Sequence, residues 1–178
     1  MSACRIRAYR PDDAGDLHAA ARESVAEVFP WLSWCHPEYS IQEAVEWTQS
    51  REELTRQGVE YNFAITGERE RFLGGCGINQ INRIHRFGNL GYWVRSCEAG
   101  RGVAVEAVRL LAQFAFFNTD LVRLEILCAV GNDRSRRVAE KAGAMLEGVL
   151  RDRLTLHGIP RDAALYSLAR SSFRAFNS

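Results

Sequence analysis

The segment EAGRGVAVEA, residues 98–107, places two glycines one residue apart immediately before a run with helical periodicity. The first turn of a helix exposes unpaired N–H groups and a partial positive charge, so a loop without side chains lets a phosphate reach them. Gly100 and Gly102 would supply that access, and Arg101 between them either adds a charge-assisted contact or is solvated. The chain has no G-K-[ST] triplet, and the third glycine of a G-x-G-x-x-G pattern would fall at Val105, which excludes two common nucleotide motifs. The segment therefore predicts a phosphate site, with a plain loop-closing turn as the alternative.

A second polar pair follows about 30 residues downstream, in LCAVGNDRSRRVAEKAGA. Asn132 comes at the end of a strand-like run, and Ser135 stands three positions further on, at the start of a helical one. An asparagine just past a strand can bond an extended chain that carries amides, and the serine presents its hydroxyl nearby. The alternative is that Asn132 or Asp133 only caps the helix.

Two other side chains have reactive chemistry and a plainer alternative. Cys128 lies seven residues before Ser135, but its neighbours are apolar, which favours a buried core cysteine. Tyr166 in the last predicted strand either donates a proton or is packed with its hydroxyl hydrogen-bonded. The five cysteines form no C-x-x-C pair and no Cys/His metal spacing, which predicts reduced thiols and no metal site.

The irregular segment FPWLSWCHPEY, residues 29–39, lies between two predicted helices. Trp31 and Trp34 give it large, rigid side chains with polar tips, which suit an acceptor-binding surface. A hydrophobic plug between the two helices is the alternative for each tryptophan.

Length and composition restrict the class of protein. We expect the 178 residues to form one domain, residues 1–178, and a net charge of +1 gives no global footprint for binding nucleic acid. The N-terminus carries charges where a signal peptide needs an apolar core, and no apolar run approaches the length of a membrane span. We therefore expect a soluble, cytoplasmic protein with no direct contact to nucleic acid or membrane.

Hydrophobic periodicity and turn signals predict elements in the order β-α-α-β-β-β-α-β-α-β-β. Strands are predicted at 5–10, 61–66, 71–81, 89–94, 123–130, 145–156 and 163–170, and helices at 11–28, 40–57, 102–118 and 133–142. The helix at 40–57 begins with a capping box, SIQE. This order predicts an α/β (α+β) mixture with one mostly antiparallel sheet.

Taken together, the glycine loop and the Asn132–Ser135 segment resemble the GNAT acetyltransferase superfamily, which binds acetyl-CoA. The loop aligns with the family's R/Q-x-x-G-x-G/A motif, except that Ala99 stands where arginine or glutamine is usual. Within the superfamily the chain is similar to the RimJ/RimL type over nearly its whole length, through LGYWV, GRGVAVEAV, RLEILCAVGNDRSRRVAEKAGAMLEGVLR and WLSWCH. The resemblance implies a single GNAT-like domain, with splayed central strands flanked by about four helices, and a possible homodimer.

The resemblance also implies a mechanism in which an amine attacks the thioester of acetyl-CoA directly. Ser135 would assist the departing sulfur, and Asn132 would hold the pantetheine arm. The implied cofactor-binding residues are Tyr92, Trp93, Val94, Gly100, Arg101, Gly102, Val103, Ala104 and Asn132, with Trp31 and Trp34 for the acceptor and no metal. Similar sequences often carry an acidic residue just before the GYW strand, where this chain has Asn89, so the general base is open. His85 and Glu147 are candidates for it, each with a surface residue as the alternative.

The acceptor class follows from the cost of presenting a neutral amine. An α-amine with a pKa near 8 costs about 1.4 kcal/mol to deprotonate at pH 7, and a lysine near 10.4 costs about 4.6 kcal/mol. A site without an evident base therefore favours a peptide α-amine, as in acetylation of a ribosomal protein N-terminus. A small amine such as a polyamine or antibiotic is the second hypothesis, and a non-catalytic acyl-CoA-binding domain is the third.

Overall fold

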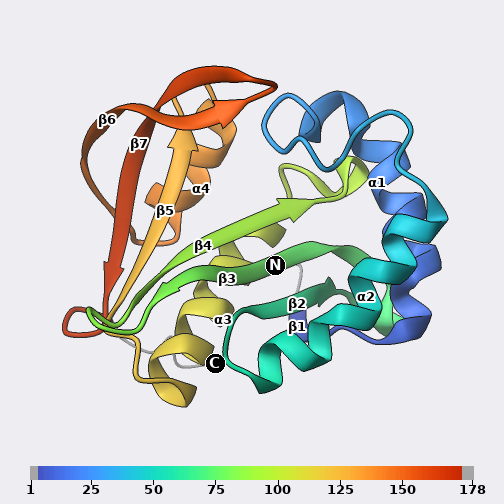
Figure 1. Cartoon of the computed structure of the whole chain (residues 1–178), viewed down its shortest axis with the longest axis horizontal. Helices are drawn as coiled ribbons and strands as arrows, with labels where there is room; N and C mark the ends of the chain where they lie inside the picture. The colour runs from blue at the N-terminus through green and yellow to red at the C-terminus, as the bar shows by residue number, and fades with distance from the viewer. Residues whose placement is uncertain (1–3, 174–178) are drawn as a thin grey trace.

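A computed structural model describes residues 4–173 of the chain (Figure 1). The strands are β1 Arg5–Ala8, β2 Tyr61–Thr66, β3 Phe72–Asn82, β4 Phe87–Val94, β5 Arg123–Ala129, β6 Met145–Leu156 and β7 Ile159–Ala169. The helices are α1 Ala14–Val28, α2 Ile41–Arg56, α3 Val103–Asn118 and α4 Asp133–Lys141, with short 3-10 helices at Pro11–Asp13, Glu68–Glu70 and Ser96–Glu98. The predicted order of strands and α-helices, and the four flanking helices, are confirmed.

The seven strands form one sheet in the order β1-β2-β3-β4-β5-β7-β6. Every neighbouring pair is antiparallel except β4 and β5, which run parallel. These two strands pair only where Phe87, Gly88 and Asn89 oppose Arg123, Leu124 and Glu125. Beyond these pairs the strands diverge, and Figure 1 shows the resulting gap between their upper ends. The splay of the central strands is therefore confirmed.

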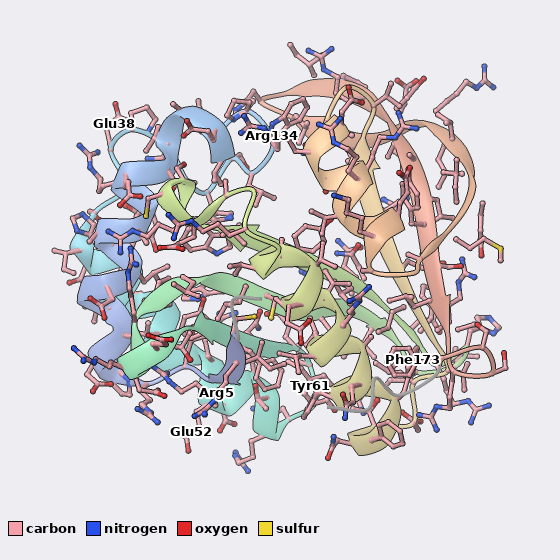
Figure 2. The ribbon with its side chains drawn as sticks, turned by 180° about the vertical axis from the view of Figure 1, so that it is seen from behind. Arg5, Glu38, Glu52, Tyr61, Arg134 and Phe173 are labelled. Carbon is pink, nitrogen blue, oxygen red and sulfur yellow. The ribbon has the colours of Figure 1, made fainter. Side chains whose placement is uncertain are left out.

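The helices cover the two faces of the sheet in separate groups. Helices α1 and α2 lie on one face, and α3 and α4 lie on the other, in front of the sheet in the reverse view (Figure 2). Side chains alternate along a strand, so Leu90 of β4 and Leu124, Ile126 and Cys128 of β5 point into the core under α3. Odd-numbered positions of β4 and β5 consequently face the α1/α2 side, which we call the acceptor face.

The N-terminal boundary differs from the prediction because of one carboxylate. Asp13 accepts hydrogen bonds from both terminal nitrogens of Arg7, at 2.8 and 2.7 Å, and from the backbone N–H of Arg10 at 2.7 Å. These bonds turn the chain after Ala8, so β1 ends there and a 3-10 helix precedes α1. The capping box at α2 is confirmed, with Ser40 and Glu43 bonding each other's backbone N–H. No helix within residues 4–173 is long and apolar enough to cross a membrane.

Candidate functional site

The loop before α3 leaves the start of that helix open. Gly100 and Gly102 have φ of 79° and 84°, in the left-handed region that glycine adopts without steric cost. A Cβ built at either position meets no atom within 4 Å, and no side chain in the described part of the chain caps the helix at Gly102. The N–H groups of the first turn, which includes Val103 and Ala104, therefore remain accessible to an anion. The turn and the phosphate site are compatible interpretations of the same two glycines.

Charged side chains beside this loop add positive charge. Glu98 is 4% exposed and pairs with Arg71 at 2.8 Å and with Arg101 at 3.3 Å. Two guanidinium groups around one carboxylate leave a net positive charge next to the helix N-terminus. Arg101 is therefore not fully solvated, although 62% of its side chain is exposed. Arg71 was not predicted, because it lies before β3 and only the fold brings it to this loop.

A cluster of hydroxyl and thiol groups lies across the splay between β4 and β5. Its members are Tyr92 of β4, Cys128 of β5 and Ser135 of α4. The Tyr92 hydroxyl donates to the carbonyl of Ser135 at 2.9 Å and lies 3.0 Å from its Oγ. Cys128 Sγ lies 3.2 Å from the same Oγ. Burial raises the pKa of the Tyr92 phenol and that of the Cys128 thiol, so both groups hold their protons at neutral pH. The cluster is thus a set of neutral hydrogen-bonding groups, and Cys128 has the buried, unreactive character that the sequence favoured.

Asn132 has one oxygen engaged and its amide nitrogen still available. Its Oδ1 accepts the backbone N–H of Ser135 at 3.1 Å and so caps α4, as the plainer interpretation predicted. Its Nδ2 has no hydrogen-bond partner among residues 4–173, which leaves a donor beside the splay.

Tyr166 is fully buried and does not contact the splay. Its hydroxyl donates to Glu140 at 2.7 Å and accepts from Arg136 at 3.3 Å, so the packed interpretation is the one the structure supports.

The backbone and side chains at positions 92–94 face different surroundings. The β4 segment from Leu90 to Val94 has no partner in β5, so its backbone groups on that edge are open to a ligand. The side chain of Trp93 points to the acceptor face, where its ring lies 5.2 Å from that of Trp34. Trp34 also contacts Tyr39, with ring centroids 5.5 Å apart. Trp34 is thus part of the packing between the N-terminal helices and the sheet.

Trp31 instead lines a cavity of about 350 Å³ on the acceptor face. The cavity lies between the end of β5, at Ala129 and Val130, and the β6–β7 hairpin, at Leu156 and Ile159. At the hairpin tip, His157 Nε2 donates to the carbonyl of Phe29 at 2.9 Å, and the two rings are 4.4 Å apart. This contact joins the hairpin to the end of α1, and Figure 1 shows the hairpin reaching the α1–α2 loop.

The two candidates for the general base are poorly suited to it. Glu147 accepts two hydrogen bonds from Arg123, at 2.7 and 2.6 Å, and another from Ser167, and these bonds lower the pKa of its carboxyl to about 2. A carboxylate held so strongly accepts a proton poorly. His85 is exposed in the β3–β4 turn, at the opposite end of β4 from α3.

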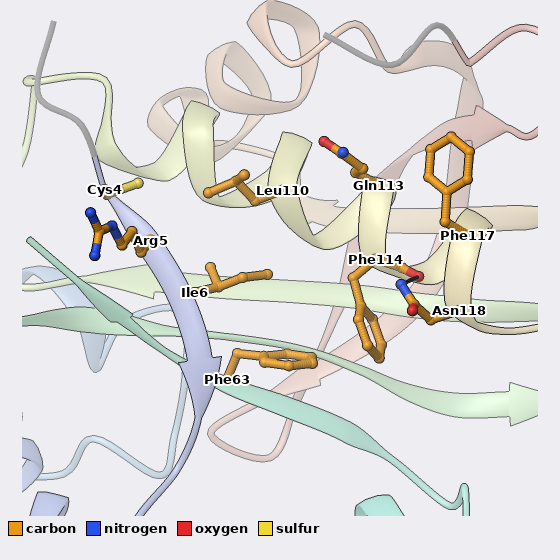
Figure 3. A pocket seen from close by; sticks show the side chains of 9 residues that line it. All are labelled: Cys4, Arg5, Ile6, Phe63, Leu110, Gln113, Phe114, Phe117 and Asn118. Atoms are coloured by element: carbon orange, nitrogen blue, oxygen red, sulfur yellow. Dashed lines mark hydrogen bonds between the residues drawn. The ribbon is translucent and has the colours of Figure 1, made fainter. Parts of the chain in front are cut away.

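A larger cavity, of about 500 Å³, lies at the opposite edge of the sheet between β1, β2 and the second half of α3 (Figure 3). Ile6, Phe63, Leu110 and Phe114 give it a largely apolar lining. It is remote from the splay, so we do not assign it to the candidate site. In the described residues 4–173, no group of His, Cys, Asp or Glu could hold a metal ion.

Comparison with known proteins agrees with this geometry. Residues 4–145 match the model of the family described as "Acetyltransferase (GNAT) domain". The chain is 29% identical to the "Putative ribosomal N-acetyltransferase YdaF" of Bacillus subtilis, over 93% of this chain and 90% of that protein. It is 28% identical to the "Ribosomal-protein-serine acetyltransferase" of Escherichia coli, over 85% and 90% of the two chains. The structure of a "putative ribosomal-protein-serine acetyltransferase" from Vibrio cholerae has 27% identity, covers 93% of each chain and superposes with a TM-score of 0.81.

Proposed function

Because the chain belongs to the GNAT acetyltransferase family, we propose that it transfers the acetyl group of acetyl-CoA to the N-terminal α-amine of a protein. The observation that carries the choice of acceptor is the bridged cavity at Trp31. The cavity lies between the end of β5 and the hairpin that the His157–Phe29 contact joins to α1, and the first residues of a peptide would bind there. The names of the B. subtilis and E. coli relatives support a ribosomal protein as the acceptor.

The cofactor side of the splay would offer contacts to the pyrophosphate, the pantetheine arm and the thioester of acetyl-CoA. The first-turn N–H groups of α3, with the net positive charge of Arg71 and Arg101 around Glu98, would hold the pyrophosphate. The free Nδ2 of Asn132 would donate to an amide of the pantetheine arm. A backbone N–H within Tyr92–Val94 would polarise the thioester carbonyl.

Acetyl-CoA supplies the acetyl group as an activated thioester. The residues around the splay orient the amine towards the thioester carbon, which lowers the entropic cost of the reaction. As the C–N bond forms and the C–S bond breaks, the Ser135 hydroxyl donates a proton to the departing sulfur. Tyr92, 3.0 Å from Ser135 Oγ, orients that hydroxyl, and solvent restores the proton of Ser135 after CoA has left.

The lining of the acceptor cavity argues against a polyamine. The residues that line it in the described chain include Arg161 and His157 but no carboxylate, so nothing there attracts a polycation. Deprotonating the α-amine also costs about 3 kcal/mol less at pH 7 than deprotonating a lysine. We also propose that the reaction takes place in the cytoplasm, where acetyl-CoA is available. We further propose that residues 1–178 form a single domain and that the protein forms a homodimer.

The test is acetyl-CoA consumption, measured as free thiol, with peptides of varied N-termini beside polyamines and aminoglycosides. We expect turnover on a peptide with a free N-terminus and none when that amine is blocked. Ser135→Ala should lower kcat by roughly tenfold and leave acetyl-CoA affinity unchanged. Tight acetyl-CoA binding without turnover on any amine would favour the non-catalytic binding domain, and turnover on polyamines alone would favour the small-amine enzyme.

A further inference from the structure

We propose that Glu125 accepts, through one water, the proton of the attacking amine. We place this amine over Gly91. The inference rests on the proposed function and adds the proton acceptor that this function requires. Two observations carry it independently: the place of Glu125 at the vertex of the splay, and the empty space above Gly91.

Glu125 occupies the last paired position before β4 and β5 separate. It is the partner of Asn89 in the parallel register, and no pair follows it along the described strands. Its neighbours Leu124 and Ile126 point into the core under α3, so the Glu125 side chain points to the acceptor face. Cys128, which contacts Ser135, lies three residues further along β5, about 10 Å away at 3.3 Å per residue. The Glu125 side chain stands on the other face of the sheet from Cys128, so a water is needed between Glu125 and an amine that attacks within the splay.

Gly91 is an unusual residue for the middle of a strand. Its backbone is not in the left-handed region, so its conformation does not require glycine. It is on the acceptor face between Asn89 and Trp93, and a Cβ built on it meets no atom within 4 Å. A strand glycine often marks a bulge, a tight bend or a place where a ligand or another backbone approaches closely, and the open space above Gly91 fits a ligand. The position is open to an amine, next to the unpaired backbone edge that faces the thioester.

The surroundings of Glu125 orient one carboxylate oxygen and leave the other available. Arg123 Nε donates to Oε1 at 2.9 Å, while both terminal nitrogens of Arg123 bind Glu147. Oε2 of Glu125 has no hydrogen-bond partner in the described residues, and its side chain is 21% exposed. The remaining neighbours, Ser167 across β7 and Asn89 across β4, are uncharged. Arg123 therefore positions Glu125, while Glu147 takes two of its three donor contacts.

Other titratable side chains near the splay have structural tasks. Glu140 lies on the opposite face, where it accepts the Tyr166 hydroxyl. His157 donates to Phe29, and Glu147 is held by Arg123 and Ser167. Among the carboxylates named here, Glu125 is the one on the acceptor face that has an unengaged oxygen.

The step is balanced with the groups named. The amine nitrogen forms a bond to the thioester carbon, and the C–S bond breaks. The proton lost by nitrogen passes through water to Glu125 and from there to solvent. The sulfur takes its proton from the Ser135 hydroxyl, CoA leaves as the free thiol, and Ser135 regains a proton from solvent.

The test compares Glu125→Gln with Glu60→Gln across pH 6 to 9, on a peptide that the wild type acetylates. Glu60 is a matched control, because it too is paired with an arginine, Arg51 at 2.9 Å, but lies at the start of β2. We expect Glu125→Gln to lower kcat about 100-fold at pH 7, with the loss shrinking as pH rises and solvent deprotonates the amine. Affinity for acetyl-CoA should not change, and Glu60→Gln should stay within about twofold of the wild type.

A kcat of Glu125→Gln within threefold of the wild type at every pH would overturn the inference. An equal loss at all pH values would do so as well, because it would indicate a structural role. Gly91→Val provides a second measurement, since its side chain fills the proposed position of the amine and should raise the KM of the peptide about tenfold. An unchanged KM would contradict that position. A wild type without turnover on any amine would overturn the proposed function itself.

Discussion

At the loop before α3, the proposed phosphate contacts come mainly from consecutive backbone groups, whereas on the acceptor face the proposed contacts come from side chains of distant segments. The phosphate loop is five adjacent residues, 100–104, and its donors are main-chain N–H groups. The acceptor face combines Trp31 after α1, Glu125 in β5 and His157 at the hairpin tip. Backbone donors survive side-chain replacement, so Ala99 in place of arginine or glutamine is compatible with cofactor binding. Side-chain contacts are lost when the side chain is replaced, so the acceptor can differ between relatives that share one cofactor.

The largest expected effect tests the backbone side. Gly102→Asp places a carboxylate at the anion site, and we expect the Kd of acetyl-CoA to rise about 100-fold, equal to about 2.7 kcal/mol. Gly102→Asn has nearly the same shape without the charge and should raise Kd less than tenfold. Isothermal titration measures both. Equal losses in the two variants would mean that backbone strain, and not charge at the helix N-terminus, controls binding.

An intermediate effect sharpens the contrast on the acceptor face. Trp31→Ala should raise the KM of the peptide about tenfold, because Trp31 lines the acceptor cavity. The affinity for acetyl-CoA should not change. Trp34→Ala should instead lower thermal stability, because Trp34 packs against Trp93 and Tyr39. Steady-state kinetics and a melting curve separate the two. A larger change in KM for Trp34→Ala than for Trp31→Ala would assign acceptor binding to Trp34.

The smallest effect concerns stability and its dependence on pH. The folded pKa of Glu147, about 2, lies below its unfolded value, so its ion pair stabilises the protein fully above about pH 4.5. That stabilisation is lost as pH falls towards 2. About a third of the side chain is exposed, so we expect Glu147→Gln to cost only about 1 kcal/mol at pH 7. Urea unfolding at pH 7 and pH 3 should show the difference from the wild type shrinking at low pH.

The same contrast explains what the sequence could reveal. The glycine loop and the Asn132–Ser135 pair could be found because each is a local motif, with its ligand groups within a few residues. The order of strands and α-helices was also predictable, because it depends on local periodicity. The boundaries of the elements were less predictable: β1 ends at Ala8 because Asp13 binds Arg7 and the backbone N–H of Arg10, contacts between side chain and chain that hydrophobic periodicity does not show.

The acceptor face could not be assembled from the sequence, because it depends on strand register. Glu125 gains its position only from pairing with Asn89, 36 residues earlier in the chain. Trp31 and Trp34 are both tryptophans of the same loop. Only the fold shows that Trp31 lines a cavity and that Trp34 packs against other aromatic rings. The Tyr92 hydroxyl was missed for the same reason, since its contact with Ser135 crosses the splay. Glu147 looked like a candidate base until Arg123 proved to be its partner.

The short β4–β5 junction also affects how the molecule melts. Three paired positions join the two parts of the sheet, so a ligand in the gap contacts both and couples their unfolding. At a free concentration one hundred times its Kd, such a ligand adds about 2.7 kcal/mol to the free energy of unfolding. The thermal denaturation midpoint should therefore rise with the concentration of acetyl-CoA, and the lifetime of the folded enzyme would follow the metabolic supply of its own substrate.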